Sequence, residues 1–206
     1  EHLSMIKNIV FDMGNVLIKY DPSQFIEEFT SNEKHQQMLL EKIFYTDEWE
    51  QYDQGTITKE EIIDKATSLL PKVLHSSIPV VMDTWFEKMT PISGMEDVVK
   101  ILKKNGYSIY LLSNVSQDFY SFRDVVPGID YFDGKFISSD WKCIKPDAEI
   151  YQLFFSYFNL EPAECFFIDD LAINIEAAAS QGMQGHIFDG NISKMTSSLN
   201  TEGVMI

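Results

Sequence analysis

The stretch IKNIVFDMGNV at residues 6–16 decides the fold. Residues 6–11 are largely apolar and include the β-branched Ile6, Ile9 and Val10, and the run stops at Asp12, Gly14 and Asn15. A short apolar run that ends in polar and turn-forming residues is typical of a buried strand. The same pattern recurs three times, in the segments at residues 107–114, 165–170 and 185–191.

Other segments have apolar residues three and four positions apart, as amphipathic helices do. They lie between or after the strand patterns, at residues 95–104, 148–158 and 173–181. Strands that alternate with helices form a parallel sheet with helices on both faces. We therefore predict an α/β fold built on a doubly wound parallel sheet.

Residues 20–85 interrupt this alternation. They contain no comparable strand pattern, and their periodicity is helical in four pieces. We predict an α/β core from residues 5–19 and 86–206, with residues 20–85 as a helical insertion. Because no Gly- or Ser-rich linker flanks the insertion, we expect it to be docked against the core.

The 206-residue chain carries 32 acidic and 16 basic residues, a net charge of −16 at pH 7. This charge repels phosphate backbones and anionic lipid headgroups, so neither nucleic acid nor a membrane is an expected partner. Arg123 is the only arginine. An anionic ligand would therefore have to be held by a metal ion or a lysine instead of an arginine fork.

Cys143 and Cys165 have neither the spacing of a zinc site nor the number needed for a disulfide framework. The sequence also has no apolar stretch of membrane-spanning length and no signal-peptide pattern. We expect a cytoplasmic protein, and the sequence leaves open whether it is a monomer or a homodimer.

Polar residues follow the predicted strands where each strand ends. Because the carboxyl ends of parallel strands open into one crevice, we expect these residues to meet there. Hard oxygen ligands together with one ammonium group suit magnesium-assisted chemistry on a phosphoryl group. The candidate residues are Asp12, Ser113, Asn114, Lys145, Asp169 and Asp170.

These residues fall into four ordered motifs that resemble those of the haloacid dehalogenase superfamily. The motifs are FDMGNV at residues 11–16, LSN at 112–114, Lys145-Pro146, and FIDD at 167–170 followed by Asn174. The resemblance implies that residues 20–85 are a C1-type cap and that the protein is an aspartate-nucleophile phosphatase. The first motif is most similar to that of the alpha-D-glucose-1-phosphate phosphatase branch.

The resemblance assigns Asp12 as the nucleophile that forms an aspartyl-phosphate. It implies that Asp12, the backbone carbonyl of Gly14 and the side chain of Asp170 bind Mg²⁺. Asp169 is then expected to act indirectly, although the choice between Asp169 and Asp170 stays open. Asn174, four residues after Asp170, is a candidate to orient the Asp170 carboxylate, and an asparagine on a helix surface is the alternative.

The resemblance also places Ser113 and the backbone of Asn114 against a phosphoryl oxygen, and Lys145 between the nucleophile and the phosphoryl group. The sequence departs from the family at Gly14, where most phosphatases have an Asp that acts as general acid and base. Such a group contributes about 10²–10⁴-fold to the rate. Either the substrate has a good leaving group, as an anomeric sugar phosphate would, or a cap residue replaces the missing Asp.

In the insertion, four residues before Gly55 are candidates for the wall of the crevice, since aromatic faces and an acceptor suit a sugar. They are Phe44, Trp49, Tyr52 and Asp53. Helix packing would explain the aromatic residues equally well.

Together these features predict a Mg²⁺-dependent phosphatase of a small phosphorylated metabolite, for example a sugar phosphate. A 2-haloacid dehalogenase is an alternative, because it uses the same nucleophile on carbon without a metal. A second alternative is a phosphate-binding or protein-interaction module that has lost turnover together with its acid and base.

Overall fold

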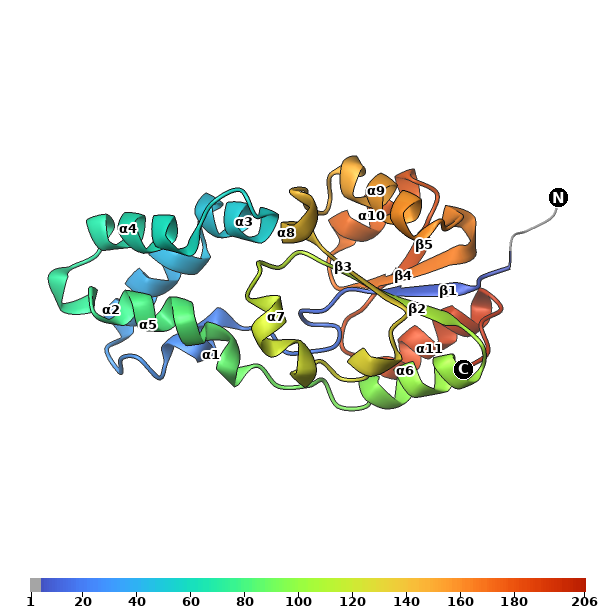
Figure 1. The fold of residues 1–206 in the computed structure, drawn as a ribbon. Helices are drawn as coiled ribbons and strands as arrows, with labels where there is room; N and C mark the ends of the chain where they lie inside the picture. The colour runs from blue at the N-terminus through green and yellow to red at the C-terminus, as the bar shows by residue number, and fades with distance from the viewer. Residues whose placement is uncertain (1–4) are drawn as a thin grey trace.

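A computed structural model describes residues 5–206 of the chain. Within these residues a parallel sheet of five strands has the order β3-β2-β1-β4-β5 (Figure 1). The strands are β1 (Asn8–Phe11), β2 (Ser108–Ser113), β3 (Gly134–Ile137), β4 (Cys165–Asp169) and β5 (Gln184–Ile187). The central strand β1 is buried along its whole length and pairs with β2 and β4. The predicted doubly wound α/β fold is confirmed.

Helices cover both faces of the sheet, as Figure 1 shows. Helices α6 (Met95–Lys104) and α11 (Ile192–Thr201) pack on one face through an apolar cluster that includes Ile9 and Phe11. Helices α9 (Ala148–Phe158) and α10 (Ala172–Ser180) cover the other face, where Val10 belongs to a second cluster. Neighbouring residues of β1 therefore point to opposite faces, as strand geometry requires.

Strand β3 was not predicted from the sequence. Its first two residues, Gly134 and Lys135, are only partly buried, and the strand lies at the edge of the sheet. An edge strand of four residues that begins with Gly and Lys lacks the continuous apolar run by which the central strands are recognised.

Residues 20–85 are helical, and Figure 1 shows them at one end of the molecule beyond the strands. The segment contains helices α1 to α5, of which the sequence pattern missed α3. The bounds are α1 (Pro22–Ile26), α2 (Glu33–Leu39) continued by the π-helix η1 (Leu40–Phe44), α3 (Asp47–Gln54), α4 (Lys59–Leu69) and α5 (Ser77–Thr84). Helix α3 has only two buried residues, Trp49 and Tyr52, too few to give a clear apolar stripe.

Two chain segments join the helical region to the sheet and pair with each other. Lys19 donates its backbone N–H to Thr90, and Ile92 donates to Leu17. Trp85 begins the short helix η3 (Trp85–Lys88) just before the second segment. This backbone pairing lies close to the boundaries that the sequence predicts for the insertion. The division into core and cap stays a prediction.

Helix α3 makes a close contact with the short helix α8 (Ser138–Trp141), which follows β3. Gly55 ends α3 in the left-handed conformation with φ of 78°, and a Cβ there would lie 2.5 Å from the backbone oxygen of Ser139. Two separate reasons therefore favour glycine at this position: the left-handed backbone conformation and the close approach of the two helices.

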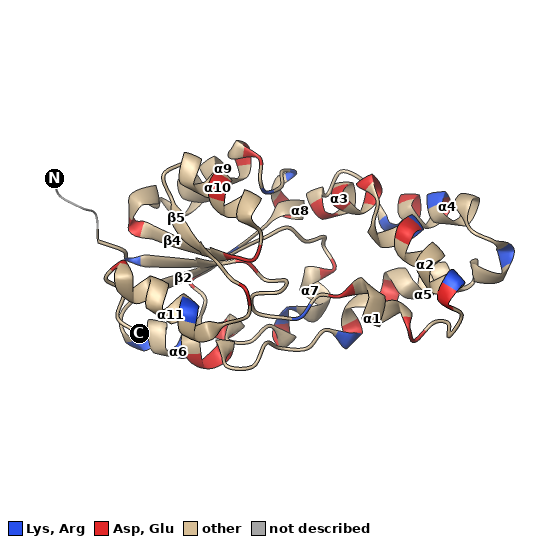
Figure 2. Ribbon diagram, turned by 180° about the vertical axis from the view of Figure 1, so that it is seen from behind, with Lys and Arg blue, Asp and Glu red and all other residues tan. Residues whose placement is uncertain are grey.

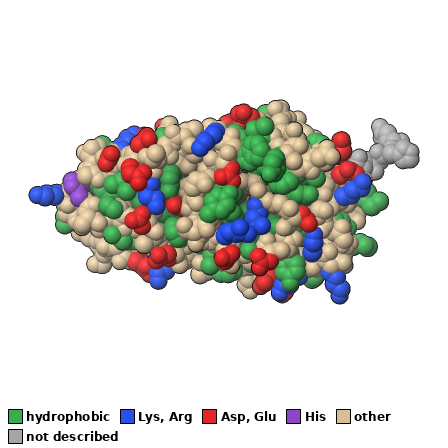
Figure 3. Space-filling model, viewed as in Figure 1, with side chains coloured by type: hydrophobic (Ala, Val, Ile, Leu, Met, Phe, Trp, Pro, Cys, Tyr) green, Lys and Arg blue, Asp and Glu red, His purple; other side chains and the backbone are tan. Residues whose placement is uncertain are grey.

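The surface carries charges of both signs, with acidic residues in excess. Acidic residues lie on α3 and on the helices around the sheet (Figure 2). On the face shown in Figure 3, hydrophobic side chains form small separate groups between charged ones. Among the described residues, no helix has both the length and the apolar character needed to cross a bilayer.

Candidate active site

The predicted strand-end residues meet at the carboxyl edge of the sheet. Asp12 follows β1 directly and extends its pairing, because its backbone N–H donates to Ile168 of β4 at 2.9 Å. Ser113 ends β2 and Asp169 ends β4. All three side chains come from parallel strands that run in the same direction, so they reach the same crevice.

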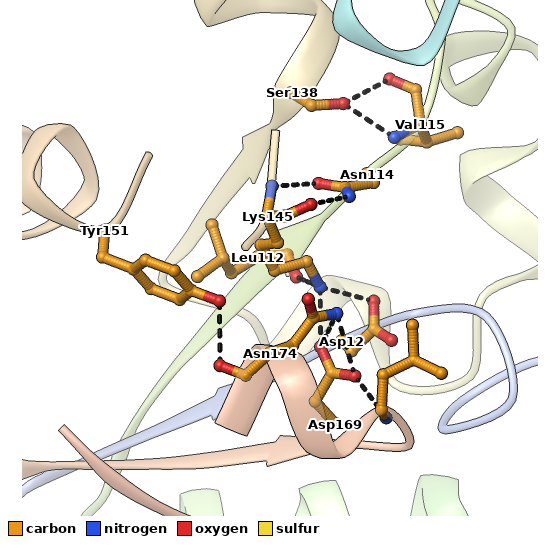
Figure 4. Close-up of polar contacts among 10 residues, drawn as sticks. Asp12, Leu112, Asn114, Val115, Ser138, Lys145, Tyr151, Asp169 and Asn174 are labelled. Atoms are coloured by element: carbon orange, nitrogen blue, oxygen red, sulfur yellow. Dashed lines mark hydrogen bonds and ion pairs between the residues drawn. The ribbon is translucent and has the colours of Figure 1, made fainter. Parts of the chain in front are cut away.

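Lys145 lies between two of the carboxylates, as Figure 4 shows. Its Nζ is 2.9 Å from Oδ1 of Asp12 and 2.8 Å from Oδ2 of Asp169. A third hydrogen bond, to the backbone oxygen of Leu112, uses its last donor. With its side chain 1% exposed, Lys145 is a fully bonded cation that fixes the positions of both carboxylates.

Asn114 holds the backbone of Lys145 in place. Its side-chain oxygen accepts from the Lys145 N–H at 2.9 Å, and its Nδ2 donates to the Lys145 carbonyl at 2.9 Å. This reciprocal pair connects the loop after β2 to the loop before α9. The amide side chain of Asn114 is thus engaged within the protein, and its backbone is the part left for the predicted phosphoryl contact.

The adjacent residues Asp169 and Asp170 have different surroundings. Asp169 is completely buried, and besides Lys145 its carboxylate accepts from Leu171 N at 2.9 Å. Asp170 is only partly buried and lines the cavity described below. Asp170 is therefore the better placed of the two to meet a ligand.

Asn174 contacts Asp169, and the prediction that it orients Asp170 is wrong. Its Nδ2 lies 3.2 and 3.3 Å from the two oxygens of Asp169. The expected four-residue spacing applies within a helix, but α10 begins only at Ala172, so Asp170 precedes it. Tyr151 donates to the backbone oxygen of Asn174 and supports its position.

The site has more negative than positive groups. Burial raises the pKa of Asp12 to about 8, Lys145 opposes this rise, and the charge of Asp169 adds to it. Burial alone would lower the pKa of Lys145, but Asp12 and Asp169 together raise it above its ordinary value. Burial also raises the pKa of Asp170. One ammonium cannot balance three carboxylates, so the group requires protons or another cation.

Carboxylate oxygens of Asp12, Asp169 and Asp170 lie within 4.8 Å of one another. Oxygen donors at this spacing suit a hard divalent cation such as Mg²⁺. The backbone of Gly14 lines the same cavity and offers a further carbonyl. The residues therefore fit the predicted magnesium site.

A cavity of about 400 Å³ opens from these residues toward the helical region. Asp12, Ser113, Lys145 and Asp170 line one end of it. Three of the four predicted wall residues of the insertion also line it, namely Phe44, Trp49 and Asp53. Tyr52 does not, because its hydroxyl donates to Asp118 at 2.8 Å.

Several cavity residues were missed by sequence reasoning. They include Tyr20, Tyr45, Trp85, Met89 and Phe122. Trp85 and Phe122 come from distant parts of the chain, and their rings are 5.8 Å apart. No motif marks such residues, because apolar side chains have the same spacing whether they fill a core or line a cavity.

Comparison with known families agrees with this geometry. The model of the family described as haloacid dehalogenase-like hydrolase matches residues 6–182. The chain belongs to the haloacid dehalogenase-like hydrolases. It is thus a hydrolase, and the resemblance in its four motifs is confirmed at the level of the superfamily. The relation to the alpha-D-glucose-1-phosphate phosphatase branch stays a prediction.

Individual haloacid dehalogenase-like proteins are similar over most of the chain. A sesquiterpene phosphatase, astK of Aspergillus oryzae, is 29% identical and covers 89% of this chain and 90% of its own length. A D-ribitol-5-phosphate phosphatase of Bacteroides thetaiotaomicron is 25% identical, with 87% and 90% covered. The magnesium complex of the enzyme BT-2542 from that bacterium has a TM-score of 0.69 at 25% identity, covering 91% and 96%.

Proposed function

We propose that this hydrolase is a Mg²⁺-dependent phosphatase that acts on a small phosphorylated metabolite through an aspartyl-phosphate. The observation that carries the proposal is the position of Lys145 Nζ between Asp12 and Asp169, beside the carboxylate group that also includes Asp170. This arrangement leaves a nucleophilic carboxylate facing a cavity next to a site suited to a divalent cation.

In this proposal Asp12, the carbonyl of Gly14 and Asp170 bind the metal, and Asp169 acts indirectly by holding Lys145. Mg²⁺ would offset the negative charge of the carboxylates and of the phosphoryl oxygens. Lys145 keeps Asp12 oriented through Oδ1 and reduces its repulsion of an approaching phosphate. Ser113 and the backbone of Asn114 would donate to a phosphoryl oxygen.

Asp12 would attack phosphorus, and the bond from phosphorus to the ester oxygen would break as the new bond forms. Water would then hydrolyse the aspartyl-phosphate and restore Asp12. A carboxylate buried beside a cation suits this role, because its position is fixed by contacts already present before the substrate binds.

Two relatives support the proposal, since both are named as phosphatases. The magnesium complex of BT-2542 supports the choice of metal. The two phosphatase names refer to a sesquiterpene and to D-ribitol 5-phosphate, so they do not select one substrate class. Cys143 and Cys165 are both free and buried, which suits the reducing cytosol that we propose as its location.

Phosphate release from p-nitrophenyl phosphate, with and without Mg²⁺, tests the proposal. We expect turnover that requires Mg²⁺ and is lost in Asp12→Asn but retained in Asp124→Asn, a control at an exposed aspartate. Chloride release from 2-chloropropionate in the presence of a chelator would instead identify a dehalogenase. Calorimetric binding of Mg²⁺ and phosphate without any hydrolysis would identify a binding module.

A further inference from the structure

The cavity has an unequal distribution of polar groups. Most of its polar residues come from the segments at the strand ends, and Lys145 is the only cation that lines it among the described residues, while the helical region contributes Asp53 and Tyr45. Beyond the strand ends, the walls are mainly aromatic and aliphatic. Representative wall residues are Ile18, Phe44, Trp49, Trp85, Met89 and Phe122.

The aromatic walls form one continuous cluster. Trp49 lies 4.7 Å from Phe44 and 5.3 Å from Trp85, measured between ring centroids, and Tyr20 lies 6.0 Å from Trp85. Since these rings pack against each other, their faces toward the cavity are held in fixed positions. The walls therefore give a preformed apolar surface.

Two polar groups in the walls are already engaged within the protein. The indole N–H of Trp85 donates to Asp118 at 2.9 Å, and the side-chain oxygen of Asn15 accepts from the backbone of Tyr20 at 3.0 Å. A polyol in this cavity would carry several hydroxyl groups that need partners. Each hydroxyl buried without one opposes binding, whereas a hydrocarbon group needs none.

We propose that the substrate is the phosphate monoester of a predominantly hydrocarbon alcohol, whose apolar part occupies the cavity between the strand ends and the helical region. This inference rests on the proposed phosphatase function. It departs from the sugar phosphate suggested by the sequence, because stacking on an aromatic face also requires polar partners for the sugar hydroxyls.

A homologous series of primary alkyl phosphates from ethyl to octyl tests the proposal, since all members have the same kind of leaving group. We expect kcat/KM to rise by about threefold to fourfold per added methylene until the cavity is filled. Ribitol 5-phosphate should fall at least tenfold below octyl phosphate. A flat series, or a preference for ribitol 5-phosphate, would overturn the proposal.

Tyr45→Ser removes an aromatic ring that lines the cavity but is 59% exposed, so little packing is lost. We expect it to lower kcat/KM for octyl phosphate at least threefold and for ethyl phosphate less than twofold. Tyr157→Ser, at a tyrosine 61% exposed and outside the cavity, is the control. Unchanged chain-length dependence in Tyr45→Ser would place the alkyl group elsewhere. If p-nitrophenyl phosphate is also not hydrolysed, the phosphatase function itself fails.

A different observation concerns the missing acid at Gly14. Asp53 lies near the end of α3, and it is the one carboxylate that residues 20–85 contribute to the cavity. The backbone of Ser116 forms a hydrogen bond with its carboxyl, and the negative charges of Asp118 and Glu50 lie near it. No cation is among these groups in the described chain. Tyr20 faces Asp53 and lines the same cavity.

These surroundings favour the neutral carboxylic acid. Burial raises the pKa of Asp53 well above its ordinary value. The hydrogen bond from the backbone of Ser116 opposes this rise, and the negative charges of Asp118 and Glu50 add to it. A protonated carboxyl in the cavity that the nucleophile Asp12 also lines has the chemistry of a general acid.

We infer that Asp53 gives its proton to the ester oxygen of the leaving alcohol as Asp12 bonds to phosphorus. Asp53 is then ionised. In the second step it takes a proton from the water that attacks the aspartyl-phosphate, which restores both carboxyl groups. The proton balance closes over one turnover, and the cap supplies the group that Gly14 lacks.

The dependence on leaving group tests this role. Asp53→Asn should lower kcat for octyl phosphate by about 10²–10⁴-fold, the usual contribution of a general acid. It should change kcat for p-nitrophenyl phosphate less than fivefold, because p-nitrophenolate leaves without protonation. Turnover of the aryl ester also shows that the variant is folded. Asp47→Asn, at an exposed aspartate of the same helix, should leave the turnover of both substrates unchanged.

Equal losses on both esters would show that Asp53 positions the substrate or the helix instead of transferring a proton. No loss on either ester would remove it from the reaction. Either result would overturn the assignment while leaving the hydrocarbon-substrate proposal intact, because that proposal depends on the chain-length series alone.

Discussion

The hydroxyl of Tyr52 donates a 2.8 Å hydrogen bond to Oδ2 of Asp118, across the boundary between α3 and the loop that follows β2. Trp85 donates its indole N–H to the same oxygen at 2.9 Å, and Lys59 lies 3.7 Å from the other oxygen. One buried carboxylate of the core thus binds three separate parts of the helical region. Because Trp49 and Trp85 line the cavity, this contact also fixes the cavity walls.

Asp118→Ala should reduce the free energy of unfolding by about 2–4 kcal/mol. The substitution leaves the hydroxyl of Tyr52 and the indole N–H of Trp85 buried without an acceptor, at a cost of about 1–3 kcal/mol each. Urea unfolding measures the change, and Asp124→Ala serves as control, because the Asp124 side chain is 93% exposed. A loss no larger than in the control would show that Asp118 does not hold the helical region to the core.

Lys145→Met should abolish most activity, by about 10²–10³-fold. It should also lower stability without metal by about 3–5 kcal/mol, since Asp12 and Asp169 lose their shared buried partner. Added Mg²⁺ should restore part of the stability, because a cation can replace the lost charge. Lys194→Met, at a lysine 64% exposed, should change little in either measurement. If neither the Lys145→Met substitution nor added Mg²⁺ changes the free energy of unfolding, the proposed balance of charges among Lys145, Asp12 and Asp169 is wrong.

Most of the site could be predicted because its residues directly follow recognisable strands. Asp12 and Asp169 each come after an apolar run, and parallel strands bring such positions together. The sequence could not show that Asn174 would contact Asp169, since this depends on where α10 begins. A shift of two residues in a helix start changes which neighbour a side chain meets.

The parts of the fold that escaped prediction have weak local patterns. Helix α3 buries only Trp49 and Tyr52, and β3 begins with partly exposed Gly134. Contacts across the boundary, such as that of Asp118, join residues 66 positions apart, and no spacing rule reaches that far. The cavity depends on such contacts, so its shape and chemistry could be read only from the structure.

The stability of the protein should depend on pH through Asp53. Its folded-state pKa lies above the ordinary 3.8, so between these values the folded state holds a proton that the unfolded chain has released. The stabilisation is fully present below about pH 3.8 and is lost as pH rises toward the folded pKa. Asp53→Asn cannot titrate, so its stability relative to the wild type should increase from pH 4.5 to pH 8. Urea unfolding at both pH values gives this difference, and a constant difference would mean that Asp53 is ionised in the folded protein.

Gly14→Asp should restore activity to Asp53→Asn. A Cβ at Gly14 would lie 3.4 Å from the Cβ of Tyr20, an ordinary contact, so the position accepts a side chain. The added carboxyl would stand two residues after the nucleophile and could protonate the leaving oxygen in place of Asp53.

We expect the double variant to recover at least tenfold in kcat on octyl phosphate over Asp53→Asn, with little change on p-nitrophenyl phosphate. Gly14→Asn in the same background is the matched control, because it has the same shape without the acid. If Asp and Asn at this position behave alike, the recovered rate comes from packing against Tyr20, and proton supply is not what limits Asp53→Asn. Recovery by Asp alone would show that the two positions serve one chemical purpose, since an acid from either the strand end or the helical region then completes the site.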